Sequence, residues 1–483
     1  MDNQVNDEKQ PLTKAVDGIV TTSKSTTTTT TTSNSSSNNN KKFNAYSNNR
    51  YSTAVSSSSS FTRLAIFKLT LVNICGGLTF GYNTGVIAGV LNLDQWKSES
   101  EVDRGLLTCS ILIGAMFGSI IGGIVIERLG RKLPILFVAV LTIIGALGSS
   151  FVPPLWPLLI FRVILGLGVG ICGVVCPTYV SEMATPEKKG SLGTLFQIAI
   201  TVGIFVSDVL GFAFKSAIYN YRWMFGFGAI PGALLLITYF FVPESSKWIQ
   251  KKSQQRNSFL LVNSKNSRNE MGLKVLLSKS IGRFSLFIGV VLAINNQLTG
   301  INAFMFFSPS IFESAGITNG NSPMIATIFL VGWNVITTLI STFLIDRIGR
   351  RKLMLIGTLV MSTSCIILAI LNLLIKGTAL GVMSIILLFI FIAGFEASAG
   401  PLFWILVIEI FPVEMREIGS SILNAIQWIF NITLSFSFLS LVSLIGQSAI
   451  FFIFGGFGVL CLIFMYIYLP ETKQDDDDDD DDR

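Results

Sequence analysis

Two charged turns decide the fold of this chain: Glu127-Arg128-Leu129-Gly130-Arg131-Lys132 and Asp346-Arg347-Ile348-Gly349-Arg350-Arg351, which begin 219 positions apart. Each turn lies between two apolar runs that are long enough to cross a lipid bilayer. A second repeat, at a spacing of 227, directly follows an apolar segment in each half: Pro243-Glu244-Ser245 and Pro470-Glu471-Thr472. A duplicated membrane unit with charges at matching turns is typical of transporters built from two helical bundles.

The composition supports a membrane protein. The chain has 483 residues, of which 51% are hydrophobic and 13% charged, whereas soluble domains have roughly 25% charged residues. Twelve apolar segments are near or above the ~20 residues that span a hydrocarbon core. They lie at about 64–91, 106–126, 133–152, 158–179, 192–213, 223–242, 284–311, 324–345, 353–375, 380–408, 418–444 and 449–469. The sequence therefore predicts an all-α membrane protein with twelve transmembrane helices in two pseudo-symmetric six-helix bundles.

Composition divides the chain into five parts. Residues 1–60 form a Ser-, Thr- and Asn-rich cytoplasmic tail, which is expected to be disordered because it has little apolar surface to bury. The first bundle spans 61–245, a basic cytoplasmic linker spans 246–280, and the second bundle spans 281–470. Residues 471–483 form an acidic cytoplasmic tail.

The distribution of basic residues predicts the orientation. With the N-terminus inside, the inner loops carry nineteen Lys and Arg, and the outer loops carry five. Because positive loops stay on the cytoplasmic side, both termini are predicted to be cytoplasmic, in a multi-pass protein of the plasma membrane. The net charge of +6 then reflects topology and does not indicate nucleic-acid binding. The oligomeric state stays open.

Several chemical classes are disfavoured. The chain has no histidine, and its six cysteines lie in apolar segments without metal-ligand spacing, so neither a metal nor a cofactor is expected. The stretch Gly168-x-Gly170-x-x-Gly173 matches a dinucleotide fingerprint in letters only, because it lies inside an apolar segment, where small residues let helices pack closely. No nucleophile–base pair is visible, so an enzyme is not predicted.

The charged turns have a mechanical interpretation. Arg-rich turns can dock against acidic helix ends, and Glu182 and Glu409, which are 227 positions apart, supply those ends. Such ion pairs would latch one conformational state and break in the other. The alternative is that the charges only obey the positive-inside bias. The proposed gating set is Glu127, Arg128, Arg131, Glu182, Asp346, Arg347, Arg350, Glu409 and Arg416.

A series of motifs in a specific order resembles the sugar porter family of the major facilitator superfamily over about residues 64–473. The resemblance implies hexose or polyol transport by alternating access. The stretches that carry it, besides the paired turns, are Gly77-Leu78-Thr79-Phe80-Gly81-Tyr82-Asn83-Thr84-Gly85-Val86-Ile87, Pro177-Thr178-Tyr179-Val180-Ser181-Glu182, Arg222-Trp223-Met224, Pro243-Glu244-Ser245, Gln297-Leu298-Thr299-Gly300-Ile301-Asn302, Gly400-Pro401, Trp404, Glu409-Ile410-Phe411-Pro412, Arg416 and Pro470-Glu471-Thr472-Lys473.

The resemblance also implies a set of sugar contacts. These are Gln197, Asn296, Gln297, Asn302, Asn334, Glu396, Trp404 and Asn431. Amides donate to and accept from adjacent sugar hydroxyls, and an indole suits the apolar face of a sugar ring. An anionic substrate would instead call for bidentate Arg. For a single intramembrane amide, the alternative is a hydrogen bond between helices.

This sequence departs from the family at three places that bear on the choice of sugar. Asn296 stands where the family has Gln, Phe306 and Phe307 replace a Tyr pair, and Gln427 replaces Asn.

Expected breaks in the helices lie in the same segments as the expected sugar contacts. We expect interruptions at Thr299-Gly300 and Pro309 and at Gly400-Pro401. Their expected counterparts in the first half are Gly81 with Gly85, and the Gly run that ends in Pro177. Paired breaks in corresponding helices indicate a site near the bilayer midplane.

The residue at position 83 bears on whether transport is coupled to protons. Proton-coupled members of the family commonly have Asp where this chain has Asn83, and an amide cannot take up or release a proton in the physiological range. We therefore predict facilitated diffusion (uniport) of a neutral monosaccharide, a hexose such as glucose. Two alternatives stay open: a proton-coupled sugar or polyol (for example myo-inositol) symporter that uses Glu396, and a non-transporting sugar sensor.

Overall fold

The computed structural model describes residues 63–472, apart from 98, 153–154, 185, 262–272, 315, 318–319 and 413–414. The tail at 1–60 and most of the acidic tail therefore lie outside the described residues. Within them, the structure is helical and contains no strand.

Helices of the first half are α2 (Arg63–Leu91), α3 (Asp94–Lys97), α4 (Glu101–Leu129), α5 (Lys132–Phe151), α6 (Leu155–Met183), α7 (Pro186–Phe214), α8 (Asn220–Gly226) and α9 (Ala229–Phe241). The linker region contains α10 (Ser246–Leu261) and α11 (Leu273–Ser278). Helices of the second half are α12 (Ser280–Gln297), α13 (Ile301–Ser314), α14 (Ser322–Ile348), α15 (Arg350–Leu374), α16 (Thr378–Ala397), α17 (Ala399–Glu409), α18 (Arg416–Ile445) and α19 (Gln447–Tyr468).

Twelve helical spans in the described part of the chain are long and apolar enough to cross a membrane. Three of them consist of two consecutive helices: α8 with α9, α12 with α13, and α16 with α17. The prediction of an all-α protein with twelve transmembrane helices is confirmed.

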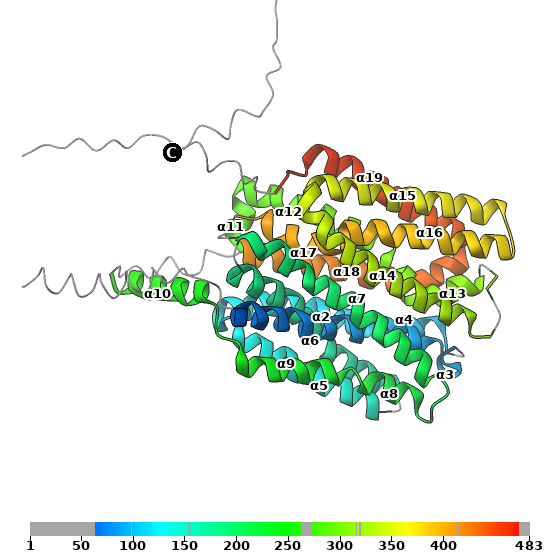
Figure 1. Ribbon diagram of the computed structural model, residues 1–483, viewed down its shortest axis with the longest axis horizontal. Helices are drawn as coiled ribbons and strands as arrows, with labels where there is room; N and C mark the ends of the chain where they lie inside the picture. The colour runs from blue at the N-terminus through cyan, green and yellow to red at the C-terminus, as the bar shows by residue number, and fades with distance from the viewer. Residues whose placement is uncertain are drawn as a thin grey trace, which may run out of the picture. The chain divides into compact units, whose positions relative to one another are not determined.

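The two halves form bundles with matching internal contacts. In the first, α2 packs on α7, α4 on α6, and α5 on α9; in the second, α12 packs on α18, α14 on α16, and α15 on α19. The bundles meet along two equivalent lines, α4 against α18 and α7 against α14. Figure 1 shows the first bundle, coloured blue to green, beside the second, coloured light green through yellow to red.

Two of the predicted helix breaks, both in the second half, are present: the one at Thr299-Gly300 and, shifted to Ser398, the one at Gly400-Pro401. The chain leaves the helix at Leu298–Gly300, between α12 and α13, and at Ser398, between α16 and α17. Gly300 has a φ of 103°, which favours glycine. The expected breaks in the first half are wrong, because α2 and α6 are continuous helices and Pro177 lies inside α6; Pro309 likewise lies inside α13.

The glycines of α2 serve close packing instead. A Cβ on Gly81 would collide with the backbone of Ile200 on α7, so only glycine allows the two helices to approach this closely. Gly170 lies in the same way against the backbone of Ala115 on α4, in agreement with a packing role for the glycines of α6.

Candidate functional site

One cavity lies between the two bundles. It has a volume of about 750 Å³, counted with the solvent at its mouth, and receives side chains from α2 and α7 of the first bundle and from α12, α13, α14, α16, α17 and α18 of the second. All eight residues that the sequence suggested as sugar contacts line it: Gln197, Asn296, Gln297, Asn302, Asn334, Glu396, Trp404 and Asn431. The tertiary structure thus brings together side chains separated by up to 234 positions.

A chain of amides surrounds the break between α12 and α13. Asn302 Nδ2 donates to Gln297 Oε1, and Gln297 Nε2 donates to Asn296 Oδ1 at 2.8 Å. Gln427 Nε2 on α18 reaches the same Asn296 oxygen at 3.1 Å. Asn296 Nδ2 in turn donates to the carbonyl of Ala399 at 2.7 Å, at the start of α17. The two interrupted spans are therefore joined through one amide.

A second cluster crosses the bundle interface. Trp404 Nε1 on α17 donates to Gln197 Oε1 on α7 at 2.9 Å. Gln197 Nε2 donates to the two carboxylate oxygens of Glu396 on α16, at 3.3 and 3.2 Å. Glu396 is 1% exposed, so its carboxylate depends on such donors. This cluster places a donor, an acceptor and a carboxylate on one wall of the cavity.

One of the predicted amides retains hydrogen-bonding capacity. Asn334 on α14 is 1% exposed, and its Oδ1 has no hydrogen-bond partner among the described residues. Asn431 on α18 also lines the cavity and accepts a 3.0 Å hydrogen bond from Ser435 Oγ. Buried polar atoms without partners are costly, so a polar ligand in this cavity would stabilise them.

Aromatic rings close the end of the cavity that faces α17. Trp404 packs edge-on against Phe80 and Phe196, with ring centroids 5.8 and 5.4 Å apart. Phe80 also contacts Trp428, at 5.4 Å. Trp404 also lines a second, narrow crevice, which extends to Glu409 at the end of α17. Trp404 therefore separates the central cavity from a crevice that leads to the side of the Gly-Arg turns.

The positions at which this sequence departs from the family lie at different depths. Phe306 and Gln427 line the cavity, whereas Phe307 stacks on Phe438, with centroids 5.1 Å apart, and is not among the lining residues. Thr201 and Trp428, which the sequence motifs do not indicate, also line the cavity. Helical spacing could have indicated both, since Thr201 lies four residues after Gln197 and Trp428 three before Asn431.

Asn83 is not among the described residues that line the cavity. Its Nδ2 donates to the carbonyls of Thr79 at 2.9 Å and Gly228 at 3.2 Å, so the side chain points into the first bundle, toward the α8–α9 junction.

The structure also shows a buried acid that the sequence analysis missed. Asp208 on α7 is 6% exposed, and its Oδ2 has no hydrogen-bond partner among the described residues. An acidic residue within an apolar span was the available signal.

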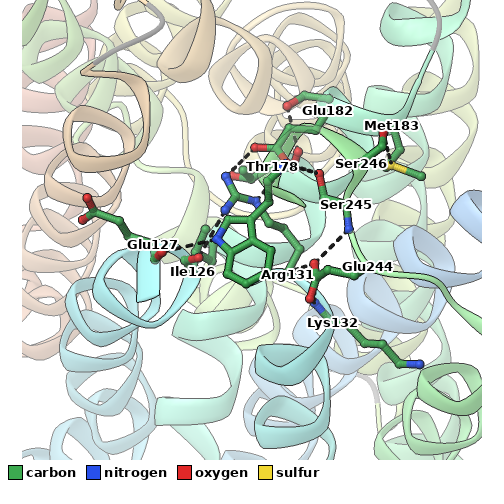
Figure 2. Close-up of polar contacts among 12 residues, drawn as sticks. Ile126, Glu127, Arg131, Lys132, Thr178, Glu182, Met183, Glu244, Ser245 and Ser246 are labelled. Carbon is green, nitrogen blue, oxygen red and sulfur yellow. Dashed lines mark hydrogen bonds and ion pairs between the residues drawn. The ribbon is translucent and has the colours of Figure 1, made fainter. Parts of the chain in front are cut away.

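A polar cluster joins the first Gly-Arg turn to the end of α6 (Figure 2). Arg131 is 1% exposed and donates two hydrogen bonds to Glu182, of 2.8 Å from Nε and 2.5 Å from Nη2. Ser245 Oγ donates to the same carboxylate at 2.6 Å. Glu244 accepts from the backbone N–H of Arg131 at 2.7 Å, so the two repeated motifs bind each other.

The second half repeats this cluster more loosely. Arg350 Nε lies 3.8 Å from Glu409 Oε2, and Thr472 Oγ1 donates to that oxygen at 2.7 Å. Glu471 accepts from the backbone N–H of Arg350 at 2.9 Å and of Arg351 at 3.1 Å. Each ion pair joins helices of one bundle, and neither pair crosses between bundles.

The remaining members of the gating set have other surroundings. Glu127, Arg128 and Arg347 are exposed, and the side chain of Asp346 lies outside the described part of the structure. Arg416 is half-buried, and its Nε has no hydrogen-bond partner among the described residues.

A membrane-spanning fold of two matched bundles with one polar cavity between them defines a transporter of small molecules. Comparison with known proteins narrows the class. The family model described as "Sugar (and other) transporter" matches residues 69–476. The chain belongs to this sugar porter family of the major facilitator superfamily.

Relatives support the assignment over most of the chain. The D-xylose transporter of Levilactobacillus brevis is 33% identical over 424 residues, which cover 82% of this chain and 90% of that protein. The galactose-proton symporter of Escherichia coli strain K12 is 33% identical over 421 residues, with 82% and 90% covered. The glucose transporter GlcP of Staphylococcus epidermidis is 33% identical over 424 residues, with 84% and 94% covered. All three are transporters rather than enzymes.

Solved structures support the same family assignment. The proton:xylose symporter XylE bound to 6-bromo-6-deoxy-D-glucose matches with a TM-score of 0.72 and 29% identity over 84% of this chain and 96% of that one. A peptide transporter matches at 13% identity with a TM-score of 0.59, which shows the shared fold alone.

Proposed function

We propose that this protein carries a neutral hexose such as glucose across the membrane by alternating access, as a uniporter. The observation that supports the proposal is the set of eight predicted contacts around one cavity. The amides of Gln297, Asn302 and Asn334 provide both donors and acceptors, as adjacent sugar hydroxyls require. Trp404 offers a flat apolar surface to the ring of the sugar.

The charges of the cavity favour a neutral substrate. Glu396 is the only acidic or basic residue among the described residues that line it, and Gln197 donates to its carboxyl group. A phosphate or carboxylate would meet no Arg or Lys there and would be repelled by an ionised Glu396.

Uniport is supported by Asn83. It occupies the position of the acid that is common in proton-coupled members of the family, and it is satisfied by two backbone carbonyls. The second candidate is proton-coupled sugar symport. Its specific support is the presence of two buried carboxylates within transmembrane helices, Glu396 and Asp208.

The charged clusters have a proposed role in gating. Arg131 binds the end of α6, which lines the crevice, and Arg350 lies against the end of α17, which lines the cavity. Both contacts lie within one bundle. We therefore assign these arginines to keeping each bundle rigid while the two bundles move. The protein is proposed to lie in the plasma membrane, with the Gly-Arg turns and both termini in the cytoplasm.

Purified protein in liposomes tests the proposal. Labelled glucose should enter down its gradient and stop at equal concentrations, with or without an imposed pH gradient. Unlabelled glucose should compete, whereas glucose 6-phosphate should not. Lack of competition by any neutral sugar would contradict sugar transport. Uphill accumulation under an inward proton gradient would replace uniport by symport.

A further inference from the structure

A groove lies on the outer surface of the first bundle, at the end opposite the Gly-Arg turns. It has a volume of about 840 Å³, counted with its open side, and lies between the end of α5 and the α8–α9 junction. Its lining residues are Leu147, Ser150, Phe151, Tyr219, Arg222, Trp223, Gly226, Phe227 and Ile230. None of these residues lines the central cavity, so the groove is separate from the sugar site.

The walls of the groove are apolar and open to the surroundings of the bundle. Phe151 is 70% exposed, Trp223 53% and Ile230 51%. Leu147 belongs to a stripe of exposed apolar residues on α5 that continues through Ile144 at helical spacing. Because α5 spans the membrane, this stripe faces hydrocarbon, and the groove opens directly onto the lipid.

Arg222 is the only charged residue among the described residues of the groove. Its guanidinium lies 4.7 Å from the centre of the Tyr219 ring, and its Nε donates a long, 3.4 Å hydrogen bond to Tyr221 Oη. Its backbone carbonyl is held by Ser150 Oγ at 2.7 Å. Among the described residues, no carboxylate lies within ion-pair distance of this guanidinium.

The position of Arg222 along the membrane normal matches a phospholipid headgroup. It lies at the first turn of the span that starts at Asn220, beside Tyr219 and Trp223. Tyr and Trp prefer the boundary between headgroups and hydrocarbon. A Cβ on Gly226 would lie 3.2 Å from Ser150 Oγ, so glycine here lets the end of α8 approach α5 closely.

We propose that this groove binds one glycerophospholipid of the leaflet opposite the Gly-Arg turns. Its phosphate diester would accept hydrogen bonds from the Arg222 guanidinium, whose planar fork matches two phosphate oxygens. One acyl chain would lie in the groove and continue along the exposed stripe of α5. A sterol would fill the apolar part but would leave the guanidinium without an anion, so a phospholipid is the better occupant.

Native mass spectrometry of the purified full-length protein tests the site. The probe is 1-palmitoyl-2-oleoyl-phosphatidylglycerol, titrated into detergent-solubilised protein, with the phosphatidylcholine analogue in parallel. Wild type should bind one copy of phospholipid before the others. Arg222→Gln should weaken that first event by about tenfold or more, because a charge-assisted hydrogen bond is lost. Arg222→Lys should retain part of the affinity.

Matched variants separate the groove from general lipid contact. Leu147→Trp should fill the groove and weaken the first binding event, whereas Leu460→Trp, at an exposed apolar position on α19 of the second bundle, should not. Lys376→Gln removes an exposed cation elsewhere and should have no effect. Sugar uptake and thermal unfolding of each variant verify that it is folded.

Two results would overturn the proposal. One is equal phospholipid binding by wild type, Arg222→Gln and Leu147→Trp, which would leave only non-specific annular lipid. The other is protection against thermal unfolding by cholesterol or by inorganic phosphate alone, with no dependence on phospholipid; it would assign the groove to a sterol or to a free anion.

Discussion

The indole N–H of Trp404 donates a 2.9 Å hydrogen bond to Oε1 of Gln197. Gln197 belongs to the first bundle and Trp404 to the second, so this bond joins the two halves at the wall of the central cavity. In the proposed alternating-access cycle the two bundles move relative to each other, so they can keep such a bond in only some of their states. The bond therefore favours the conformation seen here.

Trp404→Phe tests that relationship. The change keeps a large ring but removes the N–H donor, and should disfavour this conformation by about 0.5–1.5 kcal/mol. Spin labels at the exposed positions Glu99 and Lys376, one on each bundle, should report a shifted distance distribution. Trp333→Phe is the matched control, because Trp333 Nε1 donates to Phe389 within the second bundle. An equal shift in both variants would contradict the interpretation.

Gln297→Ala should weaken sugar binding. The variant leaves Asn302 Nδ2 without its partner, removes one of the two donors to Asn296 Oδ1, and takes a donor and an acceptor from the cavity. The expected loss is about 1–3 kcal/mol, or roughly 5- to 150-fold in half-saturation for hexose uptake. Gln250→Ala, an exposed amide on α10, serves as the control. Unchanged half-saturation in a folded Gln297→Ala protein would remove Gln297 from the site.

The two charged clusters should differ in their contribution to stability. The Arg131 side chain is 1% exposed, so Arg131→Ala leaves the Glu182 carboxylate without its main partner in a buried place. Loss of one partner of a buried ion pair typically lowers the free energy of unfolding by about 3–5 kcal/mol. Arg350→Ala should cost about 1 kcal/mol or less, because the Arg350–Glu409 contact is 3.8 Å and Glu409 keeps its hydrogen bond from Thr472. Thermal unfolding in detergent measures the difference. Equal losses would show that the looser pair is as important as the tighter one.

Gly81→Ala should prevent the close approach of α2 and α7. A Cβ there meets the backbone of Ile200, which cannot move without displacing a helix. The variant should therefore lose most of its folded yield and uptake. Gly456→Ala is the control, since nothing lies within 4 Å of a Cβ at Gly456 on α19, and the better helix propensity of Ala should stabilise that variant by up to about 1 kcal/mol. Normal uptake by Gly81→Ala would show that the bundle tolerates a wider helix pair.

Proton coupling can be assigned to individual acids. Wild-type protein in liposomes should not accumulate sugar under an inward proton gradient, and Glu396→Gln and Asp208→Asn should leave that result unchanged. If the wild type does accumulate sugar, the variant that stops accumulation while it still exchanges labelled for unlabelled sugar identifies the proton site. Asn334→Asp, which adds an acid to the cavity wall, is a useful comparison.

Much of this protein could be predicted from the sequence. Segment length and apolar composition determine twelve spans, since every backbone polar group in a bilayer must be paired within a helix. The repeated turns around Arg131 and Arg350 indicate two matching bundles. The eight cavity residues were predicted from the resemblance of the motifs to those of the sugar porter family, and the amides among them suit sugar hydroxyls.

Only the tertiary structure decided the rest. Gly81 and Pro177 read as helix breaks, but neighbouring helices decide whether a glycine or proline bends a span or lets it pack, and here both lie in continuous helices. The direction of Asn83 and the burial of Asp208 depend on which face of each helix meets its neighbours. The bond from Trp404 to Gln197 joins residues 207 positions apart, and no local pattern specifies it, because it exists only when the two bundles are packed together.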